Sequence, residues 1–436
     1  MAVHLAKGTR DLLPDQMRNR QIVMGTIQRV FEQFGFEPLQ TPAFERLDTL
    51  AGKYGAEGER LMFKILARGE DGAAGVPDLG LRYDLTVPLA RVVAMNPALR
   101  LPFKRWQMAP VWRAERPQRG RFREFYQCDA DIAGSDSPLA DAECLAVASA
   151  ALTALGFHNY LIRLNDRRIL RAMARAAGAS DRETPVLVAV DKLDKIGRDG
   201  VTGELRAAGL DDDAIAALWR ILDVPRGHAE ALDALEPLLD DEGKAGVATL
   251  RDVLALALAH GIPPERITVD PTLARGLDYY TGPVFETEVL EPKIGSISGG
   301  GRYDGLVGMF SGRQIPCVGV SLGLERIITV MEETGMLPAS SATAQALVVV
   351  GAPAHRGYAI QVATALRAEG VRTELFLDDK KFGAQLKHAD QRGIRFAVIA
   401  GEAEETARTV TLKDLVSGEQ HQLACSDAAR RIRESS

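Results

Sequence analysis

Residues 102–134 read "PFKRWQMAPVWRAERPQRGRFREFYQCDADIAG", and this stretch decides the fold. Two strand-like runs, "PFKRWQMAPVWRA" and "RFREFYQCDADIAG", are separated by the short polar segment "ERPQRG". Proline and glycine in a short link between two such runs are typical of a turn. The stretch therefore predicts an antiparallel hairpin.

The return strand of this hairpin places an unusual set of side chains on one face, because side chains alternate between faces along a strand. The set contains cations, an aromatic ring, an amide and two acids: Arg121, Arg123, Phe125, Gln127, Asp129 and Asp131, and Arg113 of the outgoing strand can join it. Arginine holds phosphate through a planar fork, and an aromatic ring can stack on a nucleotide base. The acids suit a cationic amine or a polar ring.

A solvated hairpin with a basic tip is the simpler interpretation, since runs of charge usually lie on solvated faces. We prefer it for Arg119 and Glu124. It does not explain why Arg, Phe, Gln and Asp recur at alternate positions, and a binding face therefore remains the stronger hypothesis for those residues.

The segments on either side of the hairpin predict further elements. Apolar spacing indicates a helix over residues 15–34. "LMFKILA" (61–67) and "LGLRYDLT" (79–86) predict a second hairpin, with Thr86 capping the helix that follows. A further helix starts with Ser137 as its N-cap and Pro138 in its first position.

Changes in composition and in the spacing of apolar residues along the chain predict four segments. Residues 1–166 and 262–335 carry strands and helices, whereas residues 167–261 are rich in Ala, Leu, Asp and Arg at helical spacing and indicate an inserted helical module. The linker "GMLPASSATAQ" (335–345) marks the start of the fourth segment, 336–436, in which strand and helix then alternate, and this alternation predicts a small domain with a parallel, helix-covered sheet.

Composition limits the possible classes of protein. The 436 residues are 46% hydrophobic and 26% charged, as in ordinary globular proteins, and the net charge of −6 argues against a generally basic nucleic-acid binder. Four cysteines and seven histidines are scattered, which indicates free thiols in a reducing compartment and no structural metal site. We find no signal peptide or membrane span, and we expect a cytoplasmic protein with no membrane partner.

Six segments, in order, carry a family resemblance: "KGTRDLLP", "LRYDLTVPLAR", "WRAERPQRGRFREFYQCDADIAG", "ARGLDYYTG", "SGGGRYDGL" and "GVSLGLER", between residues 7 and 326. Together they resemble the signatures of the histidyl-tRNA synthetases, a family of class II aminoacyl-tRNA synthetases. The C-terminal segment is similar to the anticodon-binding domain of that family, so the resemblance covers essentially the whole chain.

The resemblance implies an α/β multidomain fold. A class II antiparallel sheet with helices would be built from residues 1–166 and 262–335, interrupted by the helical module 167–261, and followed by the anticodon-binding α/β domain 336–436. It implies activation of L-histidine with ATP to histidyl-adenylate and pyrophosphate, and transfer of histidine to the 3′ end of tRNA(His). The expected partners are histidine, ATP, tRNA(His) and a second copy of the chain in a homodimer. Mg²⁺ would accompany the outer phosphates of ATP, without a metal cage made by the protein.

The resemblance also implies roles for residues around the histidine. Asp84, Thr86 and Gln127 would bind its α-amino group, and Asp131 and Tyr280 would recognise the imidazole ring. Some relatives carry Glu in place of Asp131, so the shorter side chain here could change how directly it meets the ring. Tyr279 would line the same site, although Tyr279 and Tyr303 could also be ordinary core aromatics.

A second group of implied roles concerns ATP and tRNA. Arg113 and Arg275 would be catalytic, reaching the α-phosphate from opposite sides, with Arg275 in a place that a metal ion fills in other class II enzymes. The remaining residues implied for ATP are Arg121 at the terminal phosphates, Phe125 stacked on adenine, and Arg326. Arg116 and Gln118 would meet the tRNA acceptor end, and Pro42 would lie at the dimer interface.

Two other functions remain open at this level. A catalytically silent paralogue, such as the regulatory subunit of ATP phosphoribosyltransferase, shares the catalytic fold but lacks the catalytic arginines and the anticodon-binding domain. Arg113, Gln127 and Arg275 are present here, and so is a C-terminal domain. The third possibility is a tRNA-sensing module, which would bind without charging and would not catalyse histidine-dependent ATP–pyrophosphate exchange.

Overall fold

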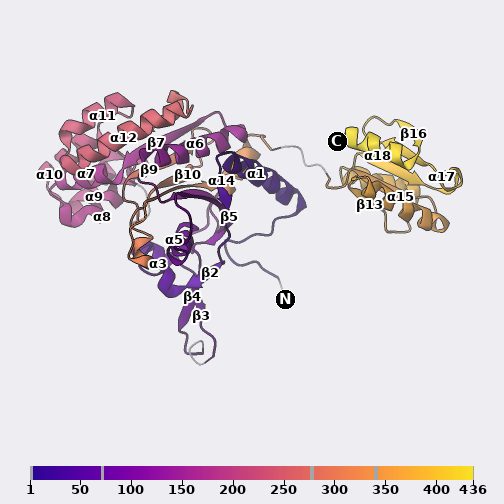
Figure 1. The fold of residues 1–436 in the computed structure, drawn as a ribbon, viewed down its shortest axis with the longest axis horizontal. Helices are drawn as coiled ribbons and strands as arrows, with labels where there is room; N and C mark the ends of the chain where they lie inside the picture. The colour runs from indigo at the N-terminus through magenta and orange to yellow at the C-terminus, as the bar shows by residue number, and fades with distance from the viewer. Residues whose placement is uncertain (1–2, 70–72, 275–278, 338–341, 436) are drawn as a thin grey trace. The chain divides into compact units, whose positions relative to one another are not determined.

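The computed structural model describes residues 3–69, 73–274, 279–337 and 342–435. The chain forms two compact units, of which the larger contains Met1–Leu12 and Arg20–Leu337 and the smaller contains Leu13–Asn19 and Pro338–Ser436. The larger unit contains a central sheet, a helical segment and a small second sheet, and the smaller unit has a sheet of its own (Figure 1).

The central sheet of the larger unit has eight strands in the order β1-β5-β6-β11-β10-β9-β7-β8. Their bounds, in this order, are Glu37–Pro38, Phe103–Trp112, Glu124–Ala133, Cys317–Gly323, Ser296–Arg302, Pro283–Val289, Tyr160–Asp166 and Ile267–Val269. The pairs β1–β5 and β7–β8 are parallel, and the other pairs are antiparallel. The predicted antiparallel sheet and its β5–β6 hairpin are therefore confirmed, with parallel pairs at both edges.

Helices α1 (Pro14–Gln33), α6 (Pro138–Ala154) and α14 (Leu324–Glu333) contribute buried side chains to the core of this sheet. The start of α6 is as predicted, because Ser137 Oγ accepts a hydrogen bond from the Leu139 amide at 3.2 Å and Pro138 follows the cap. In α1 one stripe that includes Val23, Ile27 and Phe31 is fully buried, as the helical spacing of apolar residues requires.

The small second sheet contains β2 (Phe44–Arg46), β4 (Pro77–Leu81) and β3 (Lys64–Leu66), and it lies near α2 (Leu47–Leu50), α3 (Gly55–Leu61), α5 (Thr86–Met95) and α13 (Gly308–Ser311). Two predictions are wrong here. Leu61 ends helix α3 and does not begin a strand. Thr86 does not cap α5: Leu85 is the N-cap residue, and Asp84 Oδ1 accepts the hydrogen bond of the Val87 amide at 3.0 Å.

Six α-helices lie between β7 and β8 in the sequence, gathered beside the central sheet (Figure 1). They are α7 (Arg167–Ala176), α8 (Glu183–Val190), α9 (Leu193–Ala207), α10 (Asp212–Leu222), α11 (Ala229–Leu235) and α12 (Asp241–Ala259). Helix α12 packs against α7 and also against α6. The helical segment therefore shares one continuous core with the sheet.

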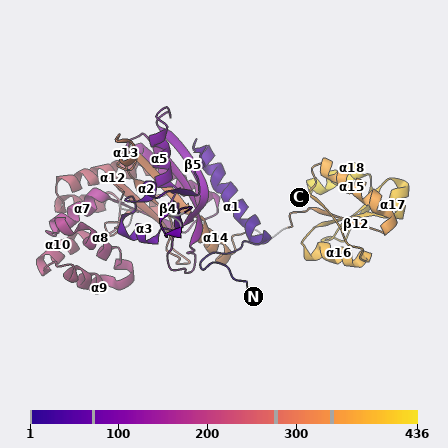
Figure 2. The same ribbon diagram turned by 90° about the horizontal axis from the view of Figure 1, so that it is seen from below.

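The C-terminal unit has the strand order β13-β12-β14-β15-β16: Thr373–Leu375, Ala346–Val350, Phe396–Ala400, Val410–Asp414 and Gln420–Leu423. Its helices are α15 (Arg356–Ala368), α16 (Phe382–Gln391), α17 (Glu402–Ala407) and α18 (Cys425–Glu434). Figure 2 shows α15 and α18 on one side of β12 and α16 on the other. The prediction of a parallel sheet is only partly right, because β15 runs antiparallel to both β14 and β16.

Candidate functional site

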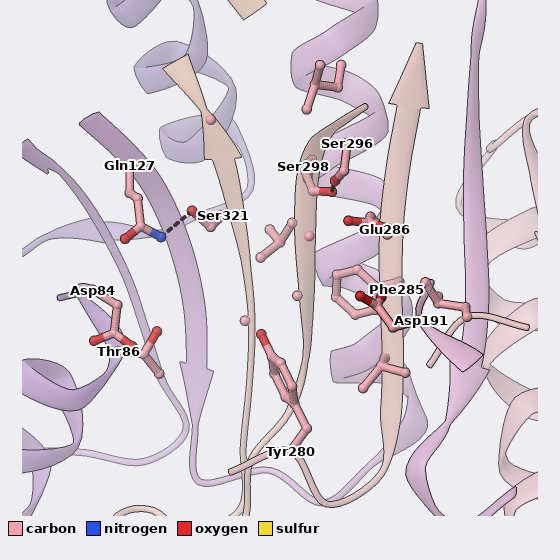
Figure 3. Close-up of a pocket in the computed structure, with 18 of the residues that line it drawn as sticks. Asp84, Thr86, Gln127, Asp191, Tyr280, Phe285, Glu286, Ser296, Ser298 and Ser321 are labelled. Carbon is pink, nitrogen blue, oxygen red and sulfur yellow. Dashed lines mark hydrogen bonds between the residues drawn. The ribbon is translucent and has the colours of Figure 1, made fainter. Parts of the chain in front are cut away.

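A cavity of about 670 Å³ opens on the central sheet, with strands β6, β9, β10 and β11 contributing its floor and walls (Figure 3). Glycines keep this floor open. A side chain at Gly319 would collide with Asp131, and one at Gly300 would collide with the backbone of β11. The glycine-rich segment "SGGGRYDG" thus serves close packing and leaves room above the sheet.

Strand β6 lines the cavity with Phe125, Gln127, Asp129 and Asp131, which confirms the predicted alternation for these four positions. The alternation does not extend back to Arg123. β6 begins at Glu124, and Arg123 lies in the preceding loop, where its Nε donates to a backbone carbonyl of that loop at 3.1 Å. Alternation is a property of strands alone, so it fails where the strand ends.

One end of the cavity gathers acceptors suited to an amine. Asp84 accepts hydrogen bonds from Tyr54 at 3.1 Å and from Tyr279 at 3.2 Å, and burial raises the pKa of its carboxyl. Gln127 Nε2 donates to Ser321 Oγ at 2.8 Å (Figure 3). This bond turns Gln127 Oε1 away from Ser321, and in the described part of the chain no donor meets that buried oxygen. Thr86 lies beside Asp84 (Figure 3).

The other end of the cavity holds Asp131. Its Oδ1 accepts a hydrogen bond from the Tyr303 hydroxyl at 2.5 Å, and its Oδ2 lies 2.9 Å from Nη2 of the fully buried Arg105. Burial raises the pKa of Asp131, and the Arg105 charge opposes this rise. Tyr303 therefore supports the site and is more than a core aromatic. The Tyr280 hydroxyl points into the cavity (Figure 3), with the Tyr279 ring 5.0 Å away in an edge arrangement.

Cations line the mouth of the cavity. Arg113 Nε donates to the Tyr83 carbonyl at 3.1 Å, and its guanidinium lies 5.1 Å from the Phe125 ring centre. Arg121 Nη1 lies 3.0 Å from Glu115 Oε2, and Arg326 donates to the Ser296 carbonyl. The structure therefore brings Arg113, Arg121 and Arg326 to one cavity. Arg275 lies outside the described residues.

Three predicted residues lie away from this cavity on exposed surface. Arg116 and Gln118 are exposed in the loop between β5 and β6. Pro42 is exposed, and its carbonyl accepts from Arg82 Nη1 at 3.1 Å. Arg119 forms an exposed ion pair with Glu333, in agreement with the simpler interpretation of that residue.

Several residues at or next to the cavity are not predicted from the sequence. Arg105, which contacts Asp131 but does not itself line the cavity, could have been predicted, because a hairpin with Arg113 opposite Arg123 also pairs Arg105 with Asp131. Ser321 and Glu286 could not, since strands distant in sequence bring them to the cavity. The same holds for three residues of the helical segment that line the cavity: Asp191 and Lys192 in the link between α8 and α9, and Lys195 in α9.

Comparisons with known proteins agree with this geometry. The family model for histidyl-tRNA synthetase matches residues 8–327, and the model for the anticodon-binding domain matches residues 345–435. The histidine–tRNA ligase of Cytophaga hutchinsonii is 41% identical over 448 residues, which cover 98% of this chain and 99% of the relative.

Solved structures extend the comparison. The crystal structure of histidyl-tRNA synthetase from Nostoc sp. PCC 7120 matches with a TM-score of 0.85 at 32% identity, and the match covers 100% of both chains. A structure described as an ATP phosphoribosyltransferase regulatory subunit/histidyl-tRNA synthetase from Bacillus halodurans C matches with a TM-score of 0.75, covering 92% of this chain and 99% of the other. At 21% identity this second match shows the fold alone.

Proposed function

The chain belongs to the histidyl-tRNA synthetase family, and from this premise we propose which of its residues carry the reaction. It is a class II histidine–tRNA ligase, which activates histidine with ATP and transfers it to tRNA(His). The observation that carries the residue assignments is the row Phe125, Gln127, Asp129 and Asp131 along one cavity, with Arg113 at its mouth.

Histidine binds along β6 with its ammonium at the Asp84 end. The Asp84 carboxylate, the Thr86 hydroxyl and the free Gln127 Oε1 are suitable acceptors for its three N–H groups. The ring lies against Asp131 and Tyr280. An apolar side chain of similar size would leave these buried polar groups unpaired, and this penalty selects for the imidazole.

ATP binds toward the mouth of the cavity. Adenine stacks on Phe125, Arg113 holds the α-phosphate, and Arg121 and Arg326 hold the outer phosphates, where Arg121 exchanges its ion pair with Glu115 for a phosphate. Mg²⁺ would accompany the outer phosphates, because a hard cation that keeps several waters is usually bound through the phosphate oxygens of the nucleotide.

The chemical step is a displacement at the α-phosphorus. A histidine carboxylate oxygen forms a bond to phosphorus, and the bond from phosphorus to the pyrophosphate oxygen breaks. The nucleophile is already an anion, so the step needs no protein base, and the site acts by positioning and by neutralising charge. Arg113 supplies this charge from one side. The role of Arg275 on the other side rests on the resemblance of "ARGLDYYTG" alone.

The acceptor end of tRNA meets Arg116 and Gln118 on the exposed loop between β5 and β6. Residues 336–436 hold the anticodon, residues 1–166 and 262–335 form the catalytic domain, and residues 167–261 form its helical insertion. Among the described residues no helix is both long and apolar enough to cross a membrane. We place the enzyme in the cytoplasm, where charged tRNA is used.

We also propose a homodimer, with Pro42 at the interface. The exposed apolar side chains of Ile22 and Phe44 fit an interface on this part of the chain. Sedimentation at micromolar concentration should give twice the chain mass. A fully active monomer at that concentration would contradict the proposal.

ATP–pyrophosphate exchange with each amino acid in turn tests the function. We expect exchange with histidine and background rates with the others. A silent paralogue or a tRNA sensor would show no exchange with any amino acid, and exchange with another amino acid would contradict the assignment of the ring site.

A further inference from the structure

Asp129 is a buried acid in the cavity that none of the roles above uses. It is 2% exposed, and it lies on β6 between Gln127 and Asp131, with its side chain lining the cavity. Within the described part of the chain, no hydrogen-bond donor meets its Oδ1. A buried acceptor without a donor is costly, so this atom is suited to a donor on whatever occupies the cavity.

The neighbours of Asp129 come from three strands and one loop. Gln107 on β5 and Ser321 on β11 lie opposite it across the sheet, Arg105 and Arg82 act on it by charge, and Asp131 and Asp84 are the nearest acids. Burial, together with the two acids, raises the pKa of Asp129 to about 7, although Arg105 and the Ser321 hydrogen bond oppose the rise. Without a ligand, the protonated form of this carboxyl is therefore favoured far more than in an ordinary aspartic acid.

The three buried acids of the cavity, Asp84, Asp129 and Asp131, differ in the cations that lie near them. Burial raises the pKa of Asp84 and the Arg113 charge opposes this rise, and Arg105 lies 2.9 Å from Asp131. Among the described residues, the cations that act on Asp129 are Arg105, which also pairs with Asp131, and Arg82, whose guanidinium donates to backbone carbonyls. The ammonium of an amino acid that enters the cavity adds a cation on the side of Asp129 that faces the ligand.

The spacing along β6 fits the same occupant. Successive residues on one face of a strand lie about 7 Å apart. Asp129 therefore lies beneath the middle of an amino acid whose ammonium reaches Gln127 and whose ring reaches Asp131. Its free Oδ1 is placed between the two ends of the substrate, where N–H groups of either end can reach it.

We propose that Asp129 is a further histidine-binding residue, whose Oδ1 accepts an N–H of bound histidine and whose carboxyl releases its proton to solvent as the ammonium arrives. The inference rests on the proposed histidine site. It adds a charged contact that makes histidine affinity depend on pH through a residue of the protein.

The direction in which histidine affinity changes with pH follows from the linkage between histidine binding and proton release. The pKa of Asp129 is raised in the free enzyme, and a bound cation lowers it, so binding releases a proton and affinity increases with pH through about 7. If binding lowers the pKa of such a group by about two, the affinity for histidine increases about ten-fold between pH 6 and pH 8. In Asp129→Asn the side chain is neutral at every pH, and this part of the increase is lost.

The test is the histidine dissociation constant of the full-length enzyme at pH 6, 7 and 8, measured by calorimetry for wild type, Asp129→Asn and Glu124→Gln. Glu124 lies exposed at the start of β6 and outside the cavity, so its variant removes one charge from the same strand without touching the site. Histidine's own titration cancels in the ratio of variant to wild type. We expect this ratio to grow by about ten-fold from pH 6 to pH 8 for Asp129→Asn and to stay constant for Glu124→Gln.

Two results would overturn the inference: an Asp129→Asn enzyme that binds as tightly as wild type at pH 8, or one that is weakened equally at every pH, as a structural role predicts. Should Asp129→Asn fail to fold, Asp129→Ser provides the same comparison with a smaller neutral group. Failure of wild type to bind histidine would instead overturn the proposed function, so the two failures are distinguishable.

Discussion

Arg105 shows how a single residue can support the site from beneath. Its side chain is fully buried, Nη2 donates to the Leu85 carbonyl at 3.1 Å, and the same nitrogen lies 2.9 Å from Asp131. Leu85 precedes α5, so one guanidinium connects the ring end of the cavity to the helix at its amine end. A residue in this position affects both stability and substrate recognition.

We therefore expect Arg105→Met to lower the free energy of unfolding by about 3–5 kcal/mol, because it leaves Asp131 buried without its cation. Histidine KM should also rise, since the pKa of Asp131 increases further and the carboxyl becomes protonated. Urea denaturation and pyrophosphate exchange measure the two effects. Arg119→Met is the matched control, because it removes an exposed ion pair and should change neither quantity. Wild-type stability in Arg105→Met would show that the buried pair is not the support described here.

At this scale the sequence predicts residues that follow from strand alternation and misses those that depend on distant contacts. Gln127 and Asp131 face the cavity because β6 is regular. The Tyr303 hydroxyl that holds Asp131 comes from 172 positions away, and no local pattern reports such a pairing. The sequence predicts Thr86 as the cap of α5, whereas the structure has Leu85 as the N-cap residue and Asp84 as the acceptor of the Val87 amide, because the start of a helix can shift by one or two residues from its sequence signal.

Among the elements, the start of α5 joins folding to binding. Asp84, which precedes the N-cap residue Leu85, accepts a hydrogen bond from the Val87 amide with Oδ1, and its Oδ2 accepts from Tyr279 and faces the cavity. One carboxylate thus serves the helix with one oxygen and the substrate with its charge. The two uses can be separated, because the side-chain oxygen of asparagine can also accept from the Val87 amide but carries no charge.

Asp84→Asn should keep a melting temperature close to wild type while histidine KM rises about ten-fold or more, because a charge-assisted hydrogen bond to the ammonium is lost. Thermal unfolding measures the melting temperature, and pyrophosphate exchange at varied histidine concentration measures histidine KM. Asp48→Asn changes an acid in the first turn of another short helix and should affect neither. A large fall in melting temperature with unchanged KM would mean that Asp84 is structural only.

Helices were predicted to within a residue or two where apolar spacing and caps agreed, as for α1 and α6. The prediction of a parallel sheet for the C-terminal segment fails at β15 and β16, for a physical reason that the sequence contains. Only five residues, 415–419, separate these strands, and a parallel neighbour needs a crossover of about a dozen residues or more. A link of five residues permits only an antiparallel hairpin, so the parallel prediction cannot hold for this pair of strands.

For the whole molecule, the division at Leu337 and Pro338 predicts separable activities. The C-terminal unit has buried clusters of its own, which include Val348, Leu366 and Phe396. A chain that ends at Leu337 should therefore fold and form histidyl-adenylate at a rate near that of the full chain, since all the lining residues of the cavity precede this point. Its rate of tRNA charging should fall steeply, because the anticodon is no longer held.

Single-turnover assays of adenylate formation and of tRNA charging compare the truncated and full chains. The full chain with the substitution Leu377→Ser, at an exposed position of the C-terminal unit, controls for small changes in that unit and should form adenylate normally. Equal charging by the truncated and full chains would show that the C-terminal unit contributes nothing to tRNA binding.

The position of the helical segment also affects how the protein is made. Strand β7 pairs with β8 and β9, and both follow it in the chain, on the far side of α7 to α12. As the polypeptide leaves the ribosome, β7 has no partner strand until residues 267–289 have been translated, whereas α7 and α12 already flank it. The helices can form early because their contacts are local, whereas β7 can pair only after β8 and β9 have been synthesised. Translation speed across residues 167–266 thus sets how long an unpaired strand is exposed to other nascent chains, and aggregation during synthesis should be sensitive to pauses in that interval.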